Sequence, residues 1–227
     1  MNTIEKHLKY YSMFALFFLA ANMTYFSMSP RIISIFSMIQ PGGIIVFPLT
    51  FFISDIITEV YGYRLARQLI WITVICLGLF TLLTSLSMLV PSAAIDKNGN
   101  SFQTVFSNYP KAFLGIAIAT LAGFLSNNFI LAKLKILAHG KHFWLRSIFS
   151  TSIGHAVFSV TWAMIFYSNH LLTADILRIS LYIYLWKITA EILLTPFTVL
   201  IAAWLKKKEG IDVYDTDTNF SPFSMKA

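Results

Sequence analysis

The residues best suited to chemistry are polar and charged side chains that lie inside apolar stretches. In the last such stretch, Tyr184, Lys187, Glu191, Thr195 and Thr198 follow each other at steps of three and four residues, which places them on one face of a helix. Lys187 and Glu191 lie too deep in the stretch for easy snorkelling, so we expect both to face a bundle interior, paired with each other or with other helices. We interpret them as a functional site, with a purely structural ion pair as the alternative.

A second polar stripe precedes this one. Ser147, Thr151, His155 and Ser159 are each four residues apart, so they also share a helix face. A single histidine in such a place either packs against its neighbours through hydrogen bonds or takes part in a solute pathway. Because its pKa lies near physiological pH, His155 is also a candidate for proton relay.

Two acids lie at the end of an earlier apolar stretch. Asp55 and Glu59 are four residues apart and share a helix face, shortly before Arg64 and Arg67. One interpretation is that they are interfacial acids paired with those two arginines. The other is that they form part of an inward-facing gate or coupling site, and their position alone does not separate the two.

Small and amide residues form a further stripe. Gly115, Ala119, Gly123 and Asn127 recur at four-residue steps, which lets two helix backbones approach closely, so this face is predicted to pack against another helix. Asn127, and Asn22 in the first apolar stretch, offer amide groups that either bond helices together or contact a polar ligand.

The composition requires a membrane. Of the 227 residues, 57% are hydrophobic and 12% are charged, against about 25% charged in an average soluble domain. A soluble core cannot hide so many apolar side chains, so lipid must cover them. Cys76 is the single cysteine, and the pair His139 and His142 has no further metal ligand nearby, so no disulfide and no metal site are predicted. No phosphate-binding loop, nucleophile elbow or zinc-peptidase motif is found, which argues against an ATPase or a hydrolase.

The apolar stretches predict an all-α, polytopic membrane protein: a six-transmembrane-helix bundle in a single domain, residues 1–208, with a short polar cytoplasmic tail, residues 209–227. Pro41-Gly42-Gly43 and Pro48 predict that the second helix is broken or kinked, either around a cavity or as a simple bend. The six predicted spans, each near the 20 residues that a bilayer requires, are approximately Tyr10–Met28, Ile32–Ile57, Leu69–Val90, Phe113–Leu131, Ile148–Tyr167 and Ile179–Leu205.

The net charge of +7 is a topology signal. Twelve of the 17 Lys and Arg residues fall on the side of the two termini and only four on the opposite side, so the positive-inside rule places both termini in the cytoplasm. The charge is therefore not evidence for nucleic-acid binding.

Four segments resemble the queuosine precursor transporter family, also called the vitamin uptake transporter family. They are FPLTFFISDIITEVYGYRLARQLIW, FWLRSIFSTSIG, YLWKITAEILLTPFTVLIAAWLKKKEGIDVYD and NFSPF, and the resemblance covers the chain from Gly43 to Phe223. It implies an importer in the bacterial inner membrane, not an enzyme, that needs no cofactor and carries 7-cyano-7-deazaguanine, 7-aminomethyl-7-deazaguanine or both for tRNA queuosine salvage. The implied partners are this small base and the lipid bilayer, without nucleic acid, and a homo-oligomer is left open.

The family's motif positions fall on Asp55, Glu59, Arg67, Arg146, Ser150, Lys187 and Glu191. From these positions and the residue patterns above, the expected substrate-binding residues are Lys187, Glu191, Asn22, Asn127 and His155, and the expected gating or coupling residues are Asp55, Glu59, Arg67, Arg146 and Ser150. The chain departs from many relatives at His155, where they have Gln or Glu, and at Phe158, where they have Asp, so the substrate is less securely implied than the family.

A deazaguanine presents two adjacent N–H donors and a carbonyl acceptor. We therefore expect Glu191 to accept from the donors, Lys187 or an Asn amide to donate to the carbonyl, and aromatic rings to stack on the base. Proton coupling and facilitated diffusion with metabolic trapping both remain open. The alternative function is an importer, or a substrate-binding membrane subunit, for another small vitamin or nucleobase that works with a separate ATPase module.

Overall fold

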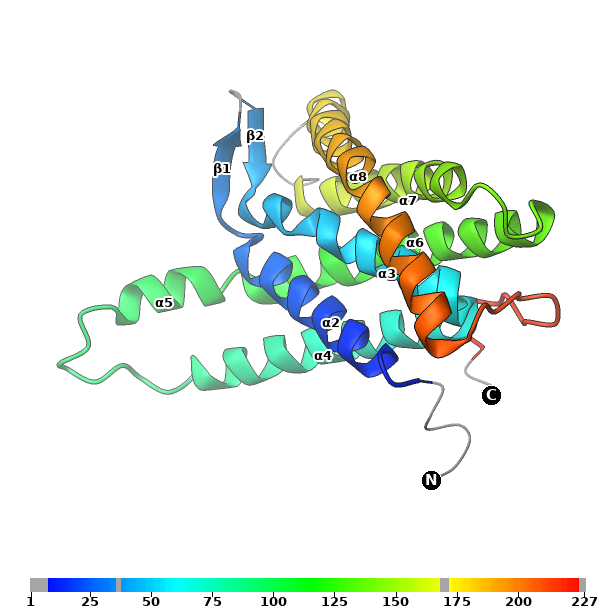
Figure 1. Cartoon of the computed structure of the whole chain (residues 1–227). Helices are drawn as coiled ribbons and strands as arrows, with labels where there is room; N and C mark the ends of the chain where they lie inside the picture. Colours follow the sequence, from blue (N-terminus) through cyan, green and yellow to red (C-terminus); the bar gives the residue numbers. More distant parts are fainter. Residues whose placement is uncertain (1–7, 36–37, 168–171, 225–227) are drawn as a thin grey trace.

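The computed structural model describes residues 8–35, 38–167 and 172–224, and within them the chain is mostly helical (Figure 1). Two short strands and one 3₁₀ turn separate the first two helices. The elements are α2 (Tyr11–Met28), β1 (Ile32–Ile35), β2 (Met38–Pro41), η1 (Gly42–Ile45), α3 (Phe47–Tyr61), α4 (Tyr63–Ser87), α5 (Gly99–Phe106), α6 (Tyr109–Leu137), α7 (Phe143–Tyr167) and α8 (Thr173–Glu209).

Four helical segments in the described part of the chain are long and apolar enough to cross a bilayer. They are Tyr63–Ser87, Gly99–Leu137, Phe143–Tyr167 and Thr173–Glu209, so the prediction of an all-α, multi-pass membrane protein is confirmed. The predicted number of six spans is not confirmed. Helix α3, with 15 residues, extends only about 22 Å, which is shorter than the hydrocarbon core of about 30 Å.

The predicted second span differs from the structure in its first half. Residues Ile32–Ile35 and Met38–Pro41 form an antiparallel hairpin, in which Ile32 pairs with Pro41, and α3 begins only at Phe47. The segment is therefore a hairpin followed by a short helix, and not one broken helix. Isoleucine-rich sequence suits strands as well as helices, and Pro48 lies in the first turn of α3, where its missing N–H has no helical partner to lose.

Helix α3 lies at the centre of the bundle and is enclosed on several sides (Figure 1). It packs against α8, α2, α6 and α4, and thirteen of its fifteen residues are buried. A short helix shielded in this way carries Asp55 and Glu59 without exposing them to lipid. Both acids are therefore surrounded by protein and not by lipid.

Helices α6 and α7 cross with almost no space between them. A Cβ atom added at Gly123 would lie 3.0 Å from the carbonyl oxygen of Gly154, and one added at Gly154 would lie 2.9 Å from that of Gly123. The small-residue stripe of α6 thus packs against a neighbouring helix, as predicted. Glycine is required here because any side chain would push the two backbones apart.

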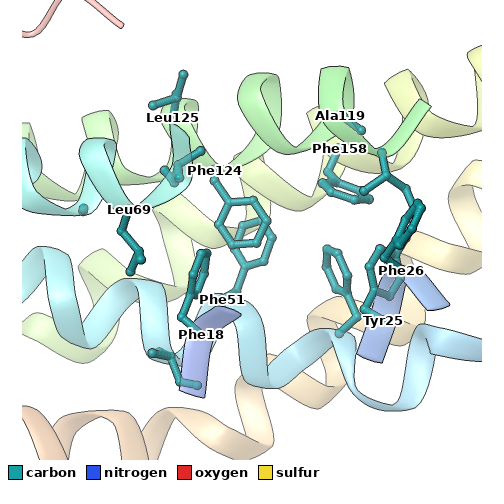
Figure 2. Close-up of a cluster of buried hydrophobic side chains, with 14 of the residues drawn as sticks. Phe18, Tyr25, Phe26, Phe51, Leu69, Ala119, Phe124, Leu125 and Phe158 are labelled. Carbon is teal, nitrogen blue, oxygen red and sulfur yellow. The ribbon is translucent and has the colours of Figure 1, made fainter. Parts of the chain in front are cut away.

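A cluster of aromatic side chains fills the space between α2, α3, α6 and α7 (Figure 2). The rings of Phe51 and Phe124 have centroids 4.0 Å apart, and Phe18 meets Phe124 edge to face at 5.5 Å. Tyr25 and Phe158 continue the cluster, with ring centroids 6.1 Å apart. This cluster forms one wall of the polar site described below.

The start of α2 and the end of α8 lie at the same end of the bundle, which we call the inner end (Figure 1). The N–H of Tyr10 donates to Oε1 of Glu209 over 2.6 Å. Residues 211–224, here named the C-terminal segment, fold back across this end: the N–H of Val213 donates to the carbonyl of Val60, and Asp215 accepts from the N–H of Tyr63. The predicted polar tail is thus packed on the bundle.

Candidate functional site

An ionic network, here named the inner network, lies at the inner end around Glu59, whose side chain is fully buried. Arg146 donates from its two terminal nitrogens to the two carboxylate oxygens of Glu59, over 2.9 and 3.1 Å. Lys206 of α8 donates to Oε1 of the same carboxylate over 2.6 Å. A bidentate arginine together with an ammonium group provides the strong pairing that a buried carboxylate needs.

The network extends to the C-terminal segment through Lys135 and Asp212. The ammonium of Lys135 donates to Oδ1 of Asp212 over 2.5 Å, to the carbonyl of Val213 over 2.7 Å and to the carbonyl of Glu59 over 2.5 Å. Lys206 also lies 2.9 Å from Asp212. Partial burial raises the pKa of Asp212, but hydrogen bonds from Lys135 and Lys206 and their charges outweigh it and hold the pKa below its ordinary value.

The arginines that follow α3 do not pair with its acids. Arg64 is exposed, and Arg67 donates from Nη1 to the backbone carbonyls of Asn219 and Ser221, over 2.6 and 2.8 Å. The interpretation that pairs Asp55 and Glu59 with these arginines is therefore wrong. Arg67 is buried, and its contacts hold the C-terminal segment in place.

One turn further into the bundle, Asp55 has a complete set of hydrogen-bond donors. The amide of Asn127 donates to Oδ1 of Asp55 over 2.6 Å, Thr151 donates to Oδ2 over 3.1 Å, and Ser147 also donates to Oδ2. These donors come from α6 and α7. The carboxylate is thus held by neutral donors and needs nothing more from the protein.

Deeper still, a group of polar side chains has no such partners. Lys187, Glu191 and His155, here named the central cluster, are each fully buried. Among the described residues, the ammonium of Lys187, both oxygens of Glu191 and both ring nitrogens of His155 have no hydrogen-bond partner. Nε2 of His155 lies 3.9 Å from Oε2 of Glu191, which is beyond hydrogen-bond distance.

Aromatic rings surround the central cluster. The ammonium of Lys187 lies 3.3 Å from the ring centroid of Phe47 and 4.0 Å from that of Phe158, which are cation–π contacts. The rings of Phe51 and His155 have centroids 4.2 Å apart. The site thus combines an acidic and a basic side chain without hydrogen-bond partners, Glu191 and Lys187, with flat aromatic walls. This combination suits a planar ligand that has both donors and acceptors.

The structure separates the predicted site residues into groups. Lys187, Glu191 and His155 meet in the central cluster, whereas Asn127 belongs to the hydrogen bonds of Asp55. The amide of Asn22 donates to the carbonyl of Phe18 in its own helix. The other gating candidates make separate contacts. Glu59 pairs with Arg146, Arg67 donates to the C-terminal segment, and the hydroxyl of Ser150 donates to the carbonyl of Ser147 in its own helix.

Sequence reasoning missed several residues of these sites. Lys135, Lys206 and Asp212 complete the inner network. In the sequence, Lys135 and Lys206 contribute only to the count of twelve cations on the side of the termini. Gln40 is buried with both amide atoms unpartnered among the described residues. Phe47 lies directly against Lys187. No local pattern in the sequence distinguishes these residues from ordinary loop or packing residues.

Fold and site together define a multi-pass membrane protein that encloses open polar groups. The family described as "Putative vitamin uptake transporter" matches residues 41–201, which include α3, the inner network except Lys206 and Asp212, and the central cluster. The chain belongs to the vitamin uptake transporter family.

A curated relative points in the same direction. Over 166 residues, which cover 66% of this chain and 72% of the relative, the chain is 22% identical to the "Probable queuosine precursor transporter" of Bacillus subtilis (strain 168). No solved structure matches the chain.

Proposed function

We propose that this protein imports queuosine precursors, 7-cyano-7-deazaguanine, 7-aminomethyl-7-deazaguanine or both, across the bacterial inner membrane for tRNA queuosine salvage. The observation that carries the proposal is the central cluster, in which three fully buried polar side chains lack hydrogen-bond partners among the described residues. Buried polar groups are nearly always hydrogen-bonded in native proteins, so such a group of exceptions marks a place where a ligand supplies the partners.

The unpartnered side chains of the central cluster indicate which hydrogen-bonding groups the ligand carries. Glu191 offers two carboxylate oxygens, which match two adjacent N–H donors on one edge of a deazaguanine. Lys187 offers donors for the carbonyl of the same base. The relative from Bacillus subtilis, named for queuosine precursors, supports this choice of substrate over other small vitamins.

The rings around the cluster favour a planar substrate. Phe47 and Phe158 lie against the ammonium of Lys187, and Phe51 lies against the ring of His155. Stacking of a base on an aromatic ring contributes about 1–3 kcal/mol in other proteins. We assign the substrate-contacting role to Lys187, Glu191 and His155, and the closing of the inner end to the network of Glu59, Arg146 and Lys206.

The orientation that we propose places both termini and the inner network in the cytoplasm. The surplus of Lys and Arg on that side supports it. The inner network and the C-terminal segment lie across the inner end, between the central cluster and the cytoplasm in this orientation. Release of a base to the cytoplasm therefore requires these contacts to open.

The direct test is a tRNA modification assay. Cells that cannot make queuosine precursors, but can insert them into tRNA, receive each base with and without this protein. We expect queuosine in tRNA at low external concentrations of at least one base only when the protein is present. Absence of queuosine with both bases, at normal protein levels in the membrane, contradicts the proposal.

Two further measurements address the energy source and the alternative function. Loss of uptake when the proton gradient is dissipated supports proton coupling, and uptake that is indifferent to the gradient supports facilitated diffusion with metabolic trapping. Co-purification of a separate ATPase module indicates instead a substrate-binding subunit for a small vitamin or nucleobase.

A further inference from the structure

Gln40 is a polar residue that the proposed mechanism leaves unused. It is the third residue of β2, and its backbone pairs with Ile33 of β1. Only 2% of its surface is exposed, yet neither its amide nitrogen nor its amide oxygen has a partner among the described residues. A buried amide that makes no hydrogen bond destabilises a protein, so its presence calls for a partner that binds from outside.

The position of Gln40 connects it to the central cluster. Strand β2 contacts α8, the helix that carries Lys187 and Glu191. The chain then runs from Pro41 through η1 directly into Phe47, whose ring lies 3.3 Å from the ammonium of Lys187. Gln40 therefore lies on the side of the central cluster opposite to the inner network.

Tyr25 joins the turn after Gln40 to the same aromatic wall. A Cβ atom added at Gly43 would lie 2.4 Å from the carbonyl oxygen of Tyr25, so the turn is held closely against α2. The ring of Tyr25 in turn packs against Phe47 and Phe158, with centroids 4.8 and 6.1 Å apart. The segment that carries Gln40 is thus fixed to the rings that surround the central cluster.

A second unpartnered group lies at a similar level on α7. Ser159 is one helical turn beyond His155, away from the inner end, and its buried hydroxyl has no partner among the described residues. It also lines a pocket of about 220 Å³ between α7 and α8, together with Ser180 and Tyr184. Unpartnered polar groups therefore continue outward from the central cluster along α7.

We infer that Gln40 is an outer substrate-binding residue, which holds the edge of a planar base by its amide before the base reaches Lys187 and Glu191. A primary amide presents a donor and an acceptor side by side, and so matches a lactam or amidine edge through two hydrogen bonds. Because the group is neutral, it holds the base less strongly than the ionic groups deeper in the bundle. This inference rests on the proposed function, since it concerns the same substrate and path.

The test compares initial rates of uptake over a range of base concentrations, in cells with equal amounts of protein. Gln40→Met removes the donor and the acceptor at similar side-chain size. We expect the KM for uptake to rise about tenfold, as for the loss of one or two neutral hydrogen bonds, with the maximal rate within about twofold of the original protein. An unchanged KM overturns the inference.

A matched control removes an unpartnered polar group away from the path. Thr73 of α4 is fully buried and its hydroxyl also has no partner among the described residues, so Thr73→Val makes a comparable change. We expect Thr73→Val to leave the KM for uptake unchanged. A rise in KM with this variant equal to that of Gln40→Met overturns the inference, because it assigns the effect to burial of polar groups in general.

A measurement without substrate separates this inference from the proposed function. Thermal unfolding of the purified, ligand-free protein in detergent should show Gln40→Met at least as stable as the original protein, because the change removes a buried unpartnered amide. A marked decrease in Tm shows instead that Gln40 has a structural partner and overturns the inference. If the original protein takes up neither base, the proposed function fails, and this stability measurement still tests Gln40.

Discussion

The inner network and the central cluster each contain a fully buried glutamate, but they differ in how its charge is paired. Glu59 accepts hydrogen bonds from both Arg146 and Lys206. Glu191, which lies five helices later on α8, has no hydrogen-bond partner among the described residues. Burial alone thus does not distinguish the two places, whereas the pairing of the carboxylate does.

The difference has a consequence for stability. A buried ion pair loses several kcal/mol when one partner is removed, because the other charge stays buried without compensation. A buried charge without a partner is costly already, so its removal relieves the folded state. The same type of substitution should therefore have opposite effects on stability at the two places.

The largest effect is expected at Glu59. Glu59→Gln leaves the buried guanidinium of Arg146 beside a neutral side chain and takes one of their two carboxylate partners from Lys135 and Lys206, so we expect the protein to lose about 3–5 kcal/mol of stability. Thermal unfolding in detergent and the amount of protein in the membrane measure this loss. The control is Asp217→Asn, which removes the same charge at an exposed position of the C-terminal segment. Equal stability of the two variants would show that the ion pairs of Glu59 do not stabilise the protein.

Glu191→Gln tests the other side of the comparison. Replacing one carboxylate oxygen by an amide nitrogen puts a donor where the base presents donors, so we expect uptake to fall by roughly 10- to 100-fold, as for the loss of a charged hydrogen bond. The stability of the ligand-free protein should not decrease. Uptake of labelled base and thermal unfolding of the same preparation measure both. Normal uptake at normal protein levels would exclude Glu191 as the group that contacts the base.

A smaller effect is expected at Arg67, which tests whether the C-terminal segment belongs to the inner network. Arg67→Met removes two hydrogen bonds to the carbonyls of Asn219 and Ser221, and we expect a loss of about 2 kcal/mol in the docking of the segment. Limited proteolysis should then cleave the segment faster. Arg64→Met is the matched control, since Arg64 is an exposed arginine on the same helix. Equal cleavage rates in the two variants would contradict this role of Arg67.

The smallest effect concerns pH. The pKa of Asp212 is lowered in the folded protein, so its contribution to stability is fully present above its unfolded value of about 4 and is lost as the pH falls through the lower folded value. We expect cleavage of the C-terminal segment by an acid-active protease to accelerate below about pH 4. Asp212→Asn should show fast cleavage already at neutral pH. A variant that is as resistant as the original protein at pH 7 would show that Asp212 does not hold the segment.

Much of the fold was predictable because lipid imposes a strong pattern on the sequence. Hydropathy located α4, α6, α7 and α8, although α6 extends from Tyr109 to Leu137 and the predicted span only from Phe113 to Leu131. Hydropathy marks the residues in lipid, and a helix continues beyond them. It failed at Ile32–Pro41, because an isoleucine-rich run has the same hydropathy in a hairpin as in a helix.

The candidate site was predictable only where its residues follow helical spacing. The steps between Lys187 and Glu191, and between Thr151 and His155, placed these residues on buried faces. The link between Glu59 and Lys206 joins residues 147 positions apart and leaves no local pattern. Gln40 was missed for a related reason: its burial depends on a hairpin that hydropathy does not reveal.

The short, enclosed helix α3 also has a consequence for how the chain is made. The donors to its two acids come much later in the sequence: Arg146 lies 87 residues after Glu59, Thr151 lies 96 residues after Asp55, and Lys206 lies 147 residues after Glu59. During translation, α3 therefore leaves the ribosome long before any of these donors exists. The hydrogen bonds of both acids are therefore complete only after α7 and α8 have been synthesised, and a chain that ends before α8 leaves Glu59 without Lys206.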